Sequence, residues 1–276
     1  MPTFDVNGVP VHAAMAGDGP PVVLVHSGGY DGGQWKGLAP HLTGYRTVAP
    51  DLYGYGRTGP WPGPAEMTLD DDGLLLLGLA AQLGEPAHLV GHSYGGAIAL
   101  RAALADAAPW RSLTLIEPMS VGTLRLMDDP TMYLALRGLL LTFFDLMGQG
   151  RQREAAGLFV DYWNARPGMF QGLPEPVQAR LGEAAHHIMR GSRALLADPT
   201  DAEALAGLRP PTLLLGMERS VRLMQELMPA LAGHLPQATL RILPGQTHMS
   251  LIGDAAPVAE ALLSFMRNID GQRAAI

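Results

Sequence analysis

Cysteine is absent from the 276-residue chain, and lysine occurs once, at Lys36. The absence of cysteine excludes disulfides, thiol nucleophiles and cysteine-based metal sites, and it fits a reducing compartment, so a cytoplasmic location is expected. A net charge of −7 with no basic run argues against a nucleic-acid partner. Histidines and carboxylates nowhere have the spacing of a metal site, so neither a metal nor another cofactor is expected.

Long hydrophobic runs are also missing. The most apolar segment, Leu139–Phe144, is bounded by Arg137 and Asp145 and is far too short to span a bilayer, which takes about 20 apolar residues. The first residues, Met1–Asp5, have neither the basic nor the apolar region of a secretory signal. We therefore expect a soluble protein without a membrane span, and a hydrophobic content of 47% is enough for a large buried core.

Short β-type runs recur along the chain and alternate with helical patterns. Asn7-Gly8 between two apolar stretches predicts an opening hairpin. The later strands are expected at Val22–Val25, Thr47–Ala49, Ala87–Val90, Leu113–Ile116, Thr212–Leu215 and Thr239–Leu243, and the helices between them at Gln34–Leu42, Asp70–Leu83, Tyr94–Leu104, Val221–Leu235 and Ala256–Arg267. This α/β alternation predicts a mostly parallel sheet with helices on both faces.

One long segment interrupts the alternation. From residue 119 to residue 208 the pattern is helical, with breakers at Arg166-Pro167-Gly168 and around Pro174. The expected helices are Met132–Met147, Arg151–Trp163, Pro176–Arg190 and Ser192–Ala197. The pattern predicts a helical lid, residues 119–208, inserted into a core made of residues 1–118 and 209–276.

The most informative motif is Gly91-His92-Ser93-Tyr94-Gly95, which joins a β-type run directly to an alanine-rich helix. A strand that becomes a helix within about one residue holds that residue in a strained conformation and lifts its side chain above the sheet. The two glycines relieve the crowding that Cβ atoms would cause there. We therefore expect Ser93 to be a nucleophile and the N–H of Tyr94, at a helix start, to be an unpaired donor.

A serine nucleophile requires a base, and His248 is the expected one. It lies in the Pro244–Met249 loop directly after the last expected strand, at the sheet edge where ligands bind in α/β proteins. The other histidines occupy expected strands, lid helices or surface positions. His92 adjoins Ser93, and its side chain should point away from the nucleophile, so it is not the expected base. It is assigned to the substrate pocket.

Four segments together resemble the α/β-hydrolase superfamily over essentially the whole chain. The segments are His26–Gly29 with Trp35 downstream, Pro50–Arg57, the Ser93 motif and Pro244–His248. The resemblance implies the α/β-hydrolase fold with an eight-stranded sheet. It also places the two donors of the oxyanion hole on the N–H groups of Gly28 and Tyr94.

The third member of the triad has two candidates, because the chain departs from the commonest family pattern. That pattern places an acid three or four residues after the glycine that closes the first strand beyond the lid, where this chain has Arg219 and Ser220. Glu218 is offset from that place. Glu117 ends the strand before the lid and is followed by Pro118, an arrangement that resembles a minority of the superfamily, including some haloalkane dehalogenases. Glu117 is the expected acid, and Glu218 is the alternative.

The lid is rich in methionine and aromatic residues, which favours an apolar acyl or alcohol group. The expected pocket residues are Tyr30, Trp35, His92, Met119 and Phe143. An ester is the leading substrate because an amide leaving group is harder to expel. The leading hypothesis is a serine hydrolase that cleaves small to medium apolar carboxylic esters through an acyl-enzyme.

Other activities use the same triad. A carbon–carbon bond hydrolase acting on a dienone acid needs an arginine for the substrate carboxylate, and Arg125, Arg137 and Arg190 are candidates. A perhydrolase of the haloperoxidase type has little lid, and a ligand receptor binds without efficient turnover. Dehalogenase and epoxide hydrolase chemistry need an aspartate where Ser93 stands. The expected partner is a small apolar ester, and the apolar Leu139–Phe144 segment allows a homodimer contact.

Overall fold

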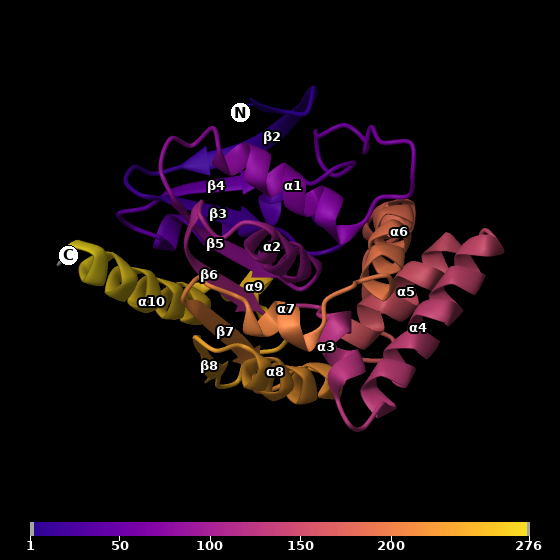
Figure 1. Ribbon diagram of the computed structural model, residues 1–276. Coiled ribbons are helices and arrows are strands. Elements are labelled where there is room, and N and C mark those ends of the chain that lie inside the picture. Colours follow the sequence, from indigo (N-terminus) through magenta and orange to yellow (C-terminus); the bar gives the residue numbers. More distant parts are fainter. Residues whose placement is uncertain (1–2, 275–276) are drawn as a thin grey trace.

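A computed structural model describes residues 3–274, which fold around one central sheet (Figure 1). The described chain contributes eight strands, in the order β1-β2-β4-β3-β5-β6-β7-β8. They are β1 (Thr3–Val6), β2 (Val9–Ala16), β3 (Pro21–Val25), β4 (Arg46–Pro50), β5 (Ala87–His92), β6 (Trp110–Ile116), β7 (Thr212–Met217) and β8 (Ala238–Leu243). The pairs β1–β2 and β2–β4 are antiparallel and all other pairs are parallel, so the predicted eight-stranded, mostly parallel sheet is confirmed.

The opening hairpin turns at the predicted dipeptide. Asn7 and Gly8 both have positive φ, 55° and 79°, which is the backbone that a tight two-residue turn requires. The predicted helix Gln34–Leu42 is wrong in its form. Two short 3₁₀ helices, η1 (Gly32–Lys36) and η2 (Ala39–His41), replace it, because Pro40 has no N–H to continue an α-helical ladder.

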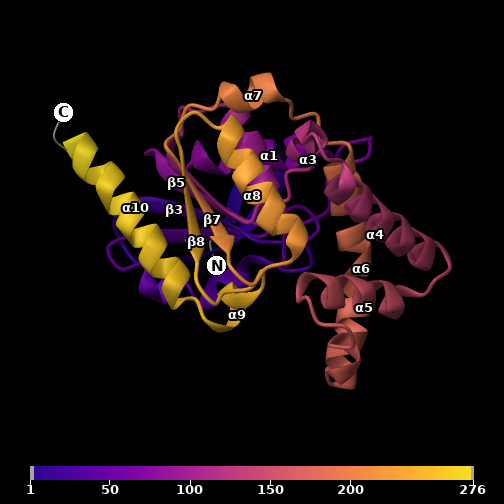
Figure 2. The ribbon, with the colours of Figure 1, turned by 90° about the horizontal axis from the view of Figure 1, so that it is seen from below.

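Helices cover both faces of the sheet (Figures 1 and 2). On one face lie α1 (Leu69–Ala80), α2 (Tyr94–Ala105) and α8 (Arg222–His234), which share one apolar cluster with the sheet. On the other face lie η1, η2 and α10 (Ala256–Ala274), with a second cluster centred on Leu24, Val90 and Leu215. The short helix α9 (Ser250–Gly253) follows the loop that carries His248.

Five helices lie between β6 and β7 in the sequence. They are α3 (Val121–Leu126), α4 (Thr131–Gly148), α5 (Gln152–Trp163), α6 (Glu175–Leu196) and α7 (Ala202–Ala206), with a short 3₁₀ turn, η3 (Phe170–Gly172), before α6. Helices α3 and α7 were not predicted from the sequence, and α6 was predicted as two helices separated at Gly191. That glycine is helical, and a Cβ there would lie 3.1 Å from the ring of Tyr94, so the missing side chain lets α6 approach the core closely.

Helix α4 contains the apolar segment Leu139–Phe144 and matches the predicted helix Met132–Met147 to within one residue at each end. Within residues 3–274 it is the one helix that meets the length and composition needed to cross a membrane. Its buried residues are Met132, Leu136, Leu140 and Phe143, which recur at helical spacing. This stripe packs α4 against its neighbours in the insertion, while Leu134 and Leu141 on the opposite side are about half exposed.

Candidate active site

The turn between β5 and α2 holds Ser93 in a strained conformation. Its φ is 53° and its ψ is −116°, a region that a residue with a side chain rarely adopts. A Cβ at Gly91 would collide with the carbonyl of Gly95, and one at Gly95 would collide with the carbonyls of Val25 and His26. A Cβ at a third glycine, Gly96, would lie 2.8 Å from Pro118, a constraint that was not recognised from the sequence.

Replacing Gly95 with alanine is expected to destabilise the protein by about 1–3 kcal/mol, the usual range for overpacking. The obstacle is backbone at the end of β3, which cannot rotate aside as a side chain can. Urea unfolding of the two proteins measures the difference. Gly138→Ala is the matched control, because nothing lies within 4 Å of a Cβ at that helical position. Equal stability of both variants and the parent would contradict the crowding argument.

Three loops at the carboxyl edge of the sheet bring Ser93, His248 and Glu117 together. The Nε2 atom of His248 lies 3.1 Å from the Oγ of Ser93. The Nδ1 atom of His248 lies 2.7 Å from Oε2 of Glu117. Both residues of this hydrogen-bonded pair are almost fully buried, so the imidazole is held by the carboxylate on one side and faces the hydroxyl on the other.

Glu117 is anchored by more than its contact with His248. Its φ is +42°, an uncommon conformation for glutamate. Its Oε1 accepts a hydrogen bond from the N–H of Met217 at 2.9 Å, and its Oε2 accepts one from the hydroxyl of Ser220 at 2.8 Å. These donors compensate a buried carboxylate for the loss of water and fix the direction in which it faces the imidazole.

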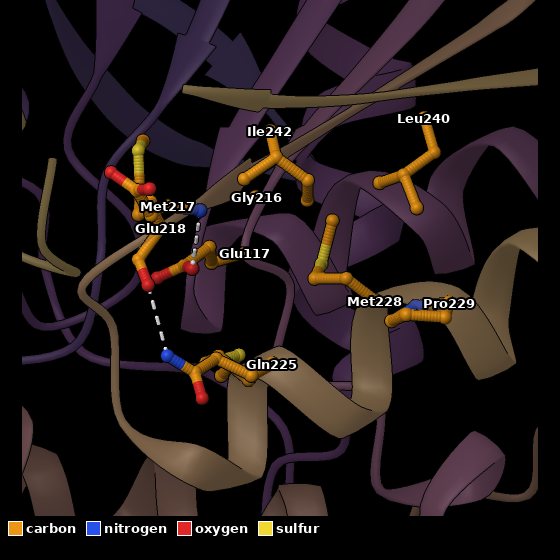
Figure 3. A pocket seen from close by; sticks show the side chains of 10 residues that line it. Glu117, Gly216, Met217, Glu218, Gln225, Met228, Pro229, Leu240 and Ile242 are labelled. Atoms are coloured by element: carbon orange, nitrogen blue, oxygen red, sulfur yellow. Dashed lines mark hydrogen bonds between the residues drawn. The ribbon is translucent and has the colours of Figure 1, made fainter. Parts of the chain in front are cut away.

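Glu218, the alternative acid, is exposed and turns to a different partner. Its Oε2 accepts from the N–H of Gly245 at 2.7 Å, and its backbone carbonyl accepts from the side chain of Gln225. Both glutamates line a hollow of about 250 Å³, together with residues of α8, β7 and β8. Figure 3 shows these side chains from close by. Glu218 therefore supports the loop that carries His248, and the geometry brings Glu117, not Glu218, to the imidazole.

Gly28 and Tyr94 lie beside each other at the same site. A Cβ on Gly28 would be 3.7 Å from the Cβ of Tyr94, and both residues line the cavity that contains Ser93. Tyr94 is the first residue of α2, so its N–H has no acceptor within the helix. Their roles as oxyanion donors stay a prediction, supported by this adjacency.

His92 was assigned to the substrate pocket, and this is wrong. The side chain is fully buried and does not line the cavity. Its Nδ1 contacts the amide nitrogen of Gln34 and its Nε2 contacts the backbone carbonyl of His248, at 3.2 and 3.1 Å. Since a carbonyl only accepts, Nε2 carries the proton and Nδ1 accepts from Gln34. Burial lowers the pKa of His92 well below its usual value, so the ring is neutral.

The chain of contacts continues to the loop that holds Gly28. The side-chain oxygen of Gln34 accepts from both the N–H and the hydroxyl of Ser27, at 2.9 and 2.8 Å. Gln34 and His92 thus connect the predicted oxyanion loop to the backbone of His248. Gln34 was missed because its partners are distant in the sequence.

Trp35 and Phe143 were also assigned to the pocket, and both assignments are wrong. Trp35 is buried in the apolar cluster on the α10 side of the sheet. Phe143 is fully buried inside the helical insertion, beside Ala155 and Ala185. Their apolar character suits a pocket and a core equally, and the sequence carried no signal to separate the two.

A cavity of about 670 Å³ opens in front of Ser93 and His248. Tyr30 and Met119 line it, as do apolar residues of α4, α5 and α6. The ring of Trp163 lies 4.6 Å from that of His248 at 31°, so it covers the imidazole and offers its π face to a charged ring. The volume lies within the usual range for small-molecule sites.

None of the three arginines proposed for a substrate carboxylate lines this cavity. Arg125 donates to the backbone carbonyl of Asp198, Arg190 donates to that of Tyr53, and Arg137 is exposed on α4. Arg180, which the sequence analysis did not select, is the arginine on the cavity wall.

A buried polar network lies under the same site. The hydroxyl of Tyr94 donates to Oδ2 of Asp72 at 3.0 Å, and Asp72 is fully buried in α1. Burial raises the pKa of Asp72 to about 7, while the nearby charge of Arg190 and the hydrogen bond from Tyr94 oppose the rise. The network therefore connects α1, α2 and α6.

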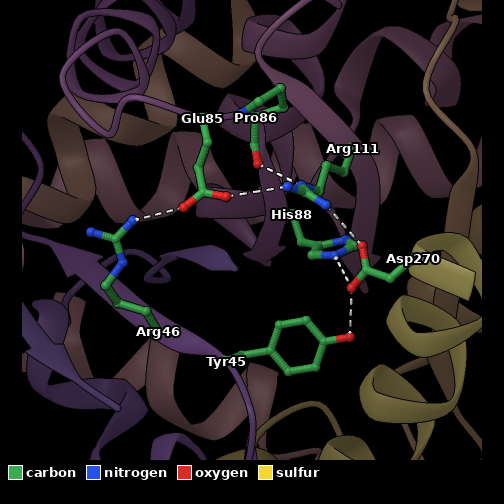
Figure 4. A network of polar contacts seen from close by, with 7 residues as sticks. All are labelled: Tyr45, Arg46, Glu85, Pro86, His88, Arg111 and Asp270. Atoms are coloured by element: carbon green, nitrogen blue, oxygen red, sulfur yellow. Dashed lines mark hydrogen bonds and ion pairs between the residues drawn. The ribbon is translucent and has the colours of Figure 1, made fainter. Parts of the chain in front are cut away.

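A second Ser–His–Asp chain lies at the opposite edge of the sheet. His88 contacts the hydroxyl of Ser112 at 2.7 Å and the carboxylate of Asp270 at 3.3 Å, and Asp270 also binds Tyr45 and Arg111 (Figure 4). Ser112 is fully buried, so no substrate reaches it. These contacts hold α10 against β5 and β6. Within residues 3–274, no three histidines or carboxylates gather as a metal site would require.

Comparisons with known proteins agree with this architecture. The profile of the alpha/beta hydrolase family matches residues 22–261. Epoxide hydrolase 2 of Siraitia grosvenorii is 37% identical over 100 residues, which cover 35% of this chain and about a third of that relative, 32%. A pimeloyl-[acyl-carrier protein] methyl ester esterase of Methylococcus capsulatus is 30% identical over 205 residues, 60% of this chain and 77% of the relative.

Solved structures extend the likeness to nearly the whole chain. An esterase from Exiguobacterium antarcticum has a TM-score of 0.77 at 19% identity, covering 97% of this chain and all of that one. An identity this low shows the fold alone. The family profile, however, spans both the Ser93 turn and the His248 loop. The chain belongs to the alpha/beta hydrolase family.

Proposed function

We propose that this protein is a serine hydrolase that cleaves carboxylic esters of small to medium apolar groups. The observation that carries the proposal is the continuous contact from Glu117 through His248 to Ser93, which opens into an apolar cavity. The helical segment 119–208 acts as the lid of that cavity. The methyl ester esterase among the relatives is consistent with ester hydrolysis.

The mechanism follows from the three contacts. His248 Nε2 takes the proton of Ser93 as Oγ bonds to the ester carbonyl carbon. The negative oxygen accepts from the N–H groups of Gly28 and Tyr94. Glu117 holds Nδ1–H and stabilises the imidazolium, which then protonates the departing alcohol. Water attacks the acyl-enzyme with His248 again as base, and releases the acid and free Ser93.

The alternatives fit less well. Epoxide hydrolysis requires an aspartate nucleophile, and serine stands at position 93. The three arginines first considered for a carbon–carbon bond hydrolase contact backbone carbonyls or solvent elsewhere. Arg180, which does line the cavity, is exposed and lies toward the far end of the α6 wall from Ser93. A perhydrolase with little lid does not match a five-helix insertion between β6 and β7 in residues 3–274. A ligand receptor without turnover does not require the hydrogen bonds that link Glu117, His248 and Ser93.

Hydrolysis of p-nitrophenyl esters of graded acyl length tests the proposal. We expect turnover that depends on Ser93, with a preference for acyl chains that the apolar cavity can hold. Ser93→Ala is the control that separates enzymatic from background hydrolysis, and fluorophosphonate labelling reports activation of the serine independently of substrate choice. A folded protein that turns over no ester, yet has normal circular dichroism, would refute the proposed activity.

A further inference from the structure

Helix α6 forms a long wall of the cavity. Its lining residues recur at helical spacing and so share one face of the helix; they are Val177, Arg180, Leu181, Ala184, His187, Ile188, Gly191, Ser192 and Leu195. Gly191 lies against the ring of Tyr94, beside the nucleophile. Arg180 precedes Gly191 by about three turns, roughly 16 Å along the helix axis. The same wall thus joins the reacting end of the cavity to Arg180.

The wall becomes more exposed toward Arg180. Gly191 and Ser192 are buried, Ala184 and His187 are partly exposed, and Arg180 is exposed. Burial, with the nearby charges of His186 and Arg190, lowers the pKa of His187 to about 4, so that ring is neutral at pH 7. Among the described residues that line the cavity, Arg180 is therefore the one permanent positive charge.

Arg180 has no partner of its own. Arg193 of α6 pairs with Glu66, and Arg153 of α5 pairs with Glu175. Arg180, by contrast, has no carboxylate within ion-pair distance among residues 3–274. The acidic residue on the cavity wall, Asp31, uses its carboxylate to cap η1 through the N–H of Gly33. The guanidinium of Arg180 is free to bind a ligand.

Tyr30 supplies a second donor on the wall of the same cavity. Its side chain lines the cavity from the loop after β3 and is partly buried. Burial raises the pKa of Tyr30, and the positive charge of Arg180 acts in the opposite direction. A phenol and a guanidinium together form a donor pair suited to a carboxylate.

We infer that the cavity is built for an ester whose acyl chain ends in a second carboxylate. Arg180 is the residue that recognises this distant anionic end. This inference rests on the proposed ester hydrolysis at Ser93. The apolar part of the chain lies along α4, α5 and α6, and the carboxylate remains partly hydrated at the exposed end of the wall. A carboxylate placed there avoids the cost of full burial, which the interior of the cavity would impose.

Matched substrates test the inference. They are p-nitrophenyl monoesters of straight-chain dicarboxylic acids and p-nitrophenyl esters of neutral fatty acids with the same chain lengths. We expect the ratio of kcat/KM, diacid over neutral, to fall about tenfold in Arg180→Gln, as the loss of a charge-assisted pair implies. The ratio in the wild-type protein should also fall as salt screens the pair. Arg193→Gln, on the same helix but outside the cavity, should keep the wild-type ratio.

Binding separates this inference from the proposed activity. In a Ser93→Ala background the uncleaved monoester binds without turnover, and Trp163 on the cavity wall reports occupancy by its fluorescence. Weaker binding of the diacid monoester after Arg180→Gln, with unchanged binding of the neutral ester, supports the carboxylate subsite even if no ester is hydrolysed. Equal loss for both ligands, or no loss for either, overturns it.

Discussion

Replacing Glu117 with glutamine is expected to lower kcat on an ester substrate by about 10³–10⁴-fold. The carboxylate accepts from Nδ1 of His248 and so keeps the proton on that atom, leaving Nε2 free to accept the proton of Ser93. An amide presents an N–H in place of one oxygen and favours the opposite tautomer, in which Nε2 is already protonated. KM should change little, because Glu117 does not line the cavity.

Glu218→Gln is the matched control for this prediction. It removes the neighbouring carboxylate, whose contact is the N–H of Gly245, and leaves the imidazole contact intact. Steady-state kinetics of both variants, with thermal unfolding to confirm their fold, gives the comparison. An active Glu117→Gln together with an inactive Glu218→Gln would assign the acid to the later loop and refute the geometry.

The position of the acid illustrates what the sequence alone could establish. The order Ser93, acid, His248 is a family pattern, but the choice between Glu117 and Glu218 depends on how the loops after β6 and β7 fold. The structure adds what no motif encodes, the positive φ of Glu117 and the hydroxyl of Ser220 on its carboxylate. Ser220 stands near the place where the commoner pattern has its acid, and here it supports the acid from the neighbouring strand.

The fold was more predictable than the cavity. Buried strands and the Ser93 turn depend on local patterns of apolar residues and glycines, which the sequence displays directly. Cavity walls depend on which face of a helix turns inward, and a lid helix that is apolar on several sides does not reveal this. Phe143 therefore proved to be core, whereas Trp163 and Arg180 proved to line the cavity.

Replacing Asp72 with asparagine is expected to make the protein more stable than the wild-type protein at pH 8, and this advantage in unfolding free energy should shrink as the pH falls. Burial raises the pKa of Asp72 from 3.8 to about 7, so folding favours the protonated acid. The stability gained from that proton is fully present below about pH 4 and is lost as the pH rises through 7, a change of about 4 kcal/mol. Asparagine has no proton to lose, and its side-chain oxygen can still accept from Tyr94.

The difference in unfolding free energy between the wild-type protein and Asp72→Asn isolates this group. Burial lowers the pKa of His26, His88 and His92, which weakens folding below pH 6.5 in both proteins, so their contribution cancels in the difference. Urea unfolding at pH 4, 6 and 8 measures it, with Asp18→Asn, at an exposed aspartate, as the control. A difference that stays constant across this range would contradict the prediction. A difference that grows with pH would establish that the charge beneath Tyr94 opposes folding at neutral pH, although the positive charge of Arg190 on α6 partly offsets the effect of burial.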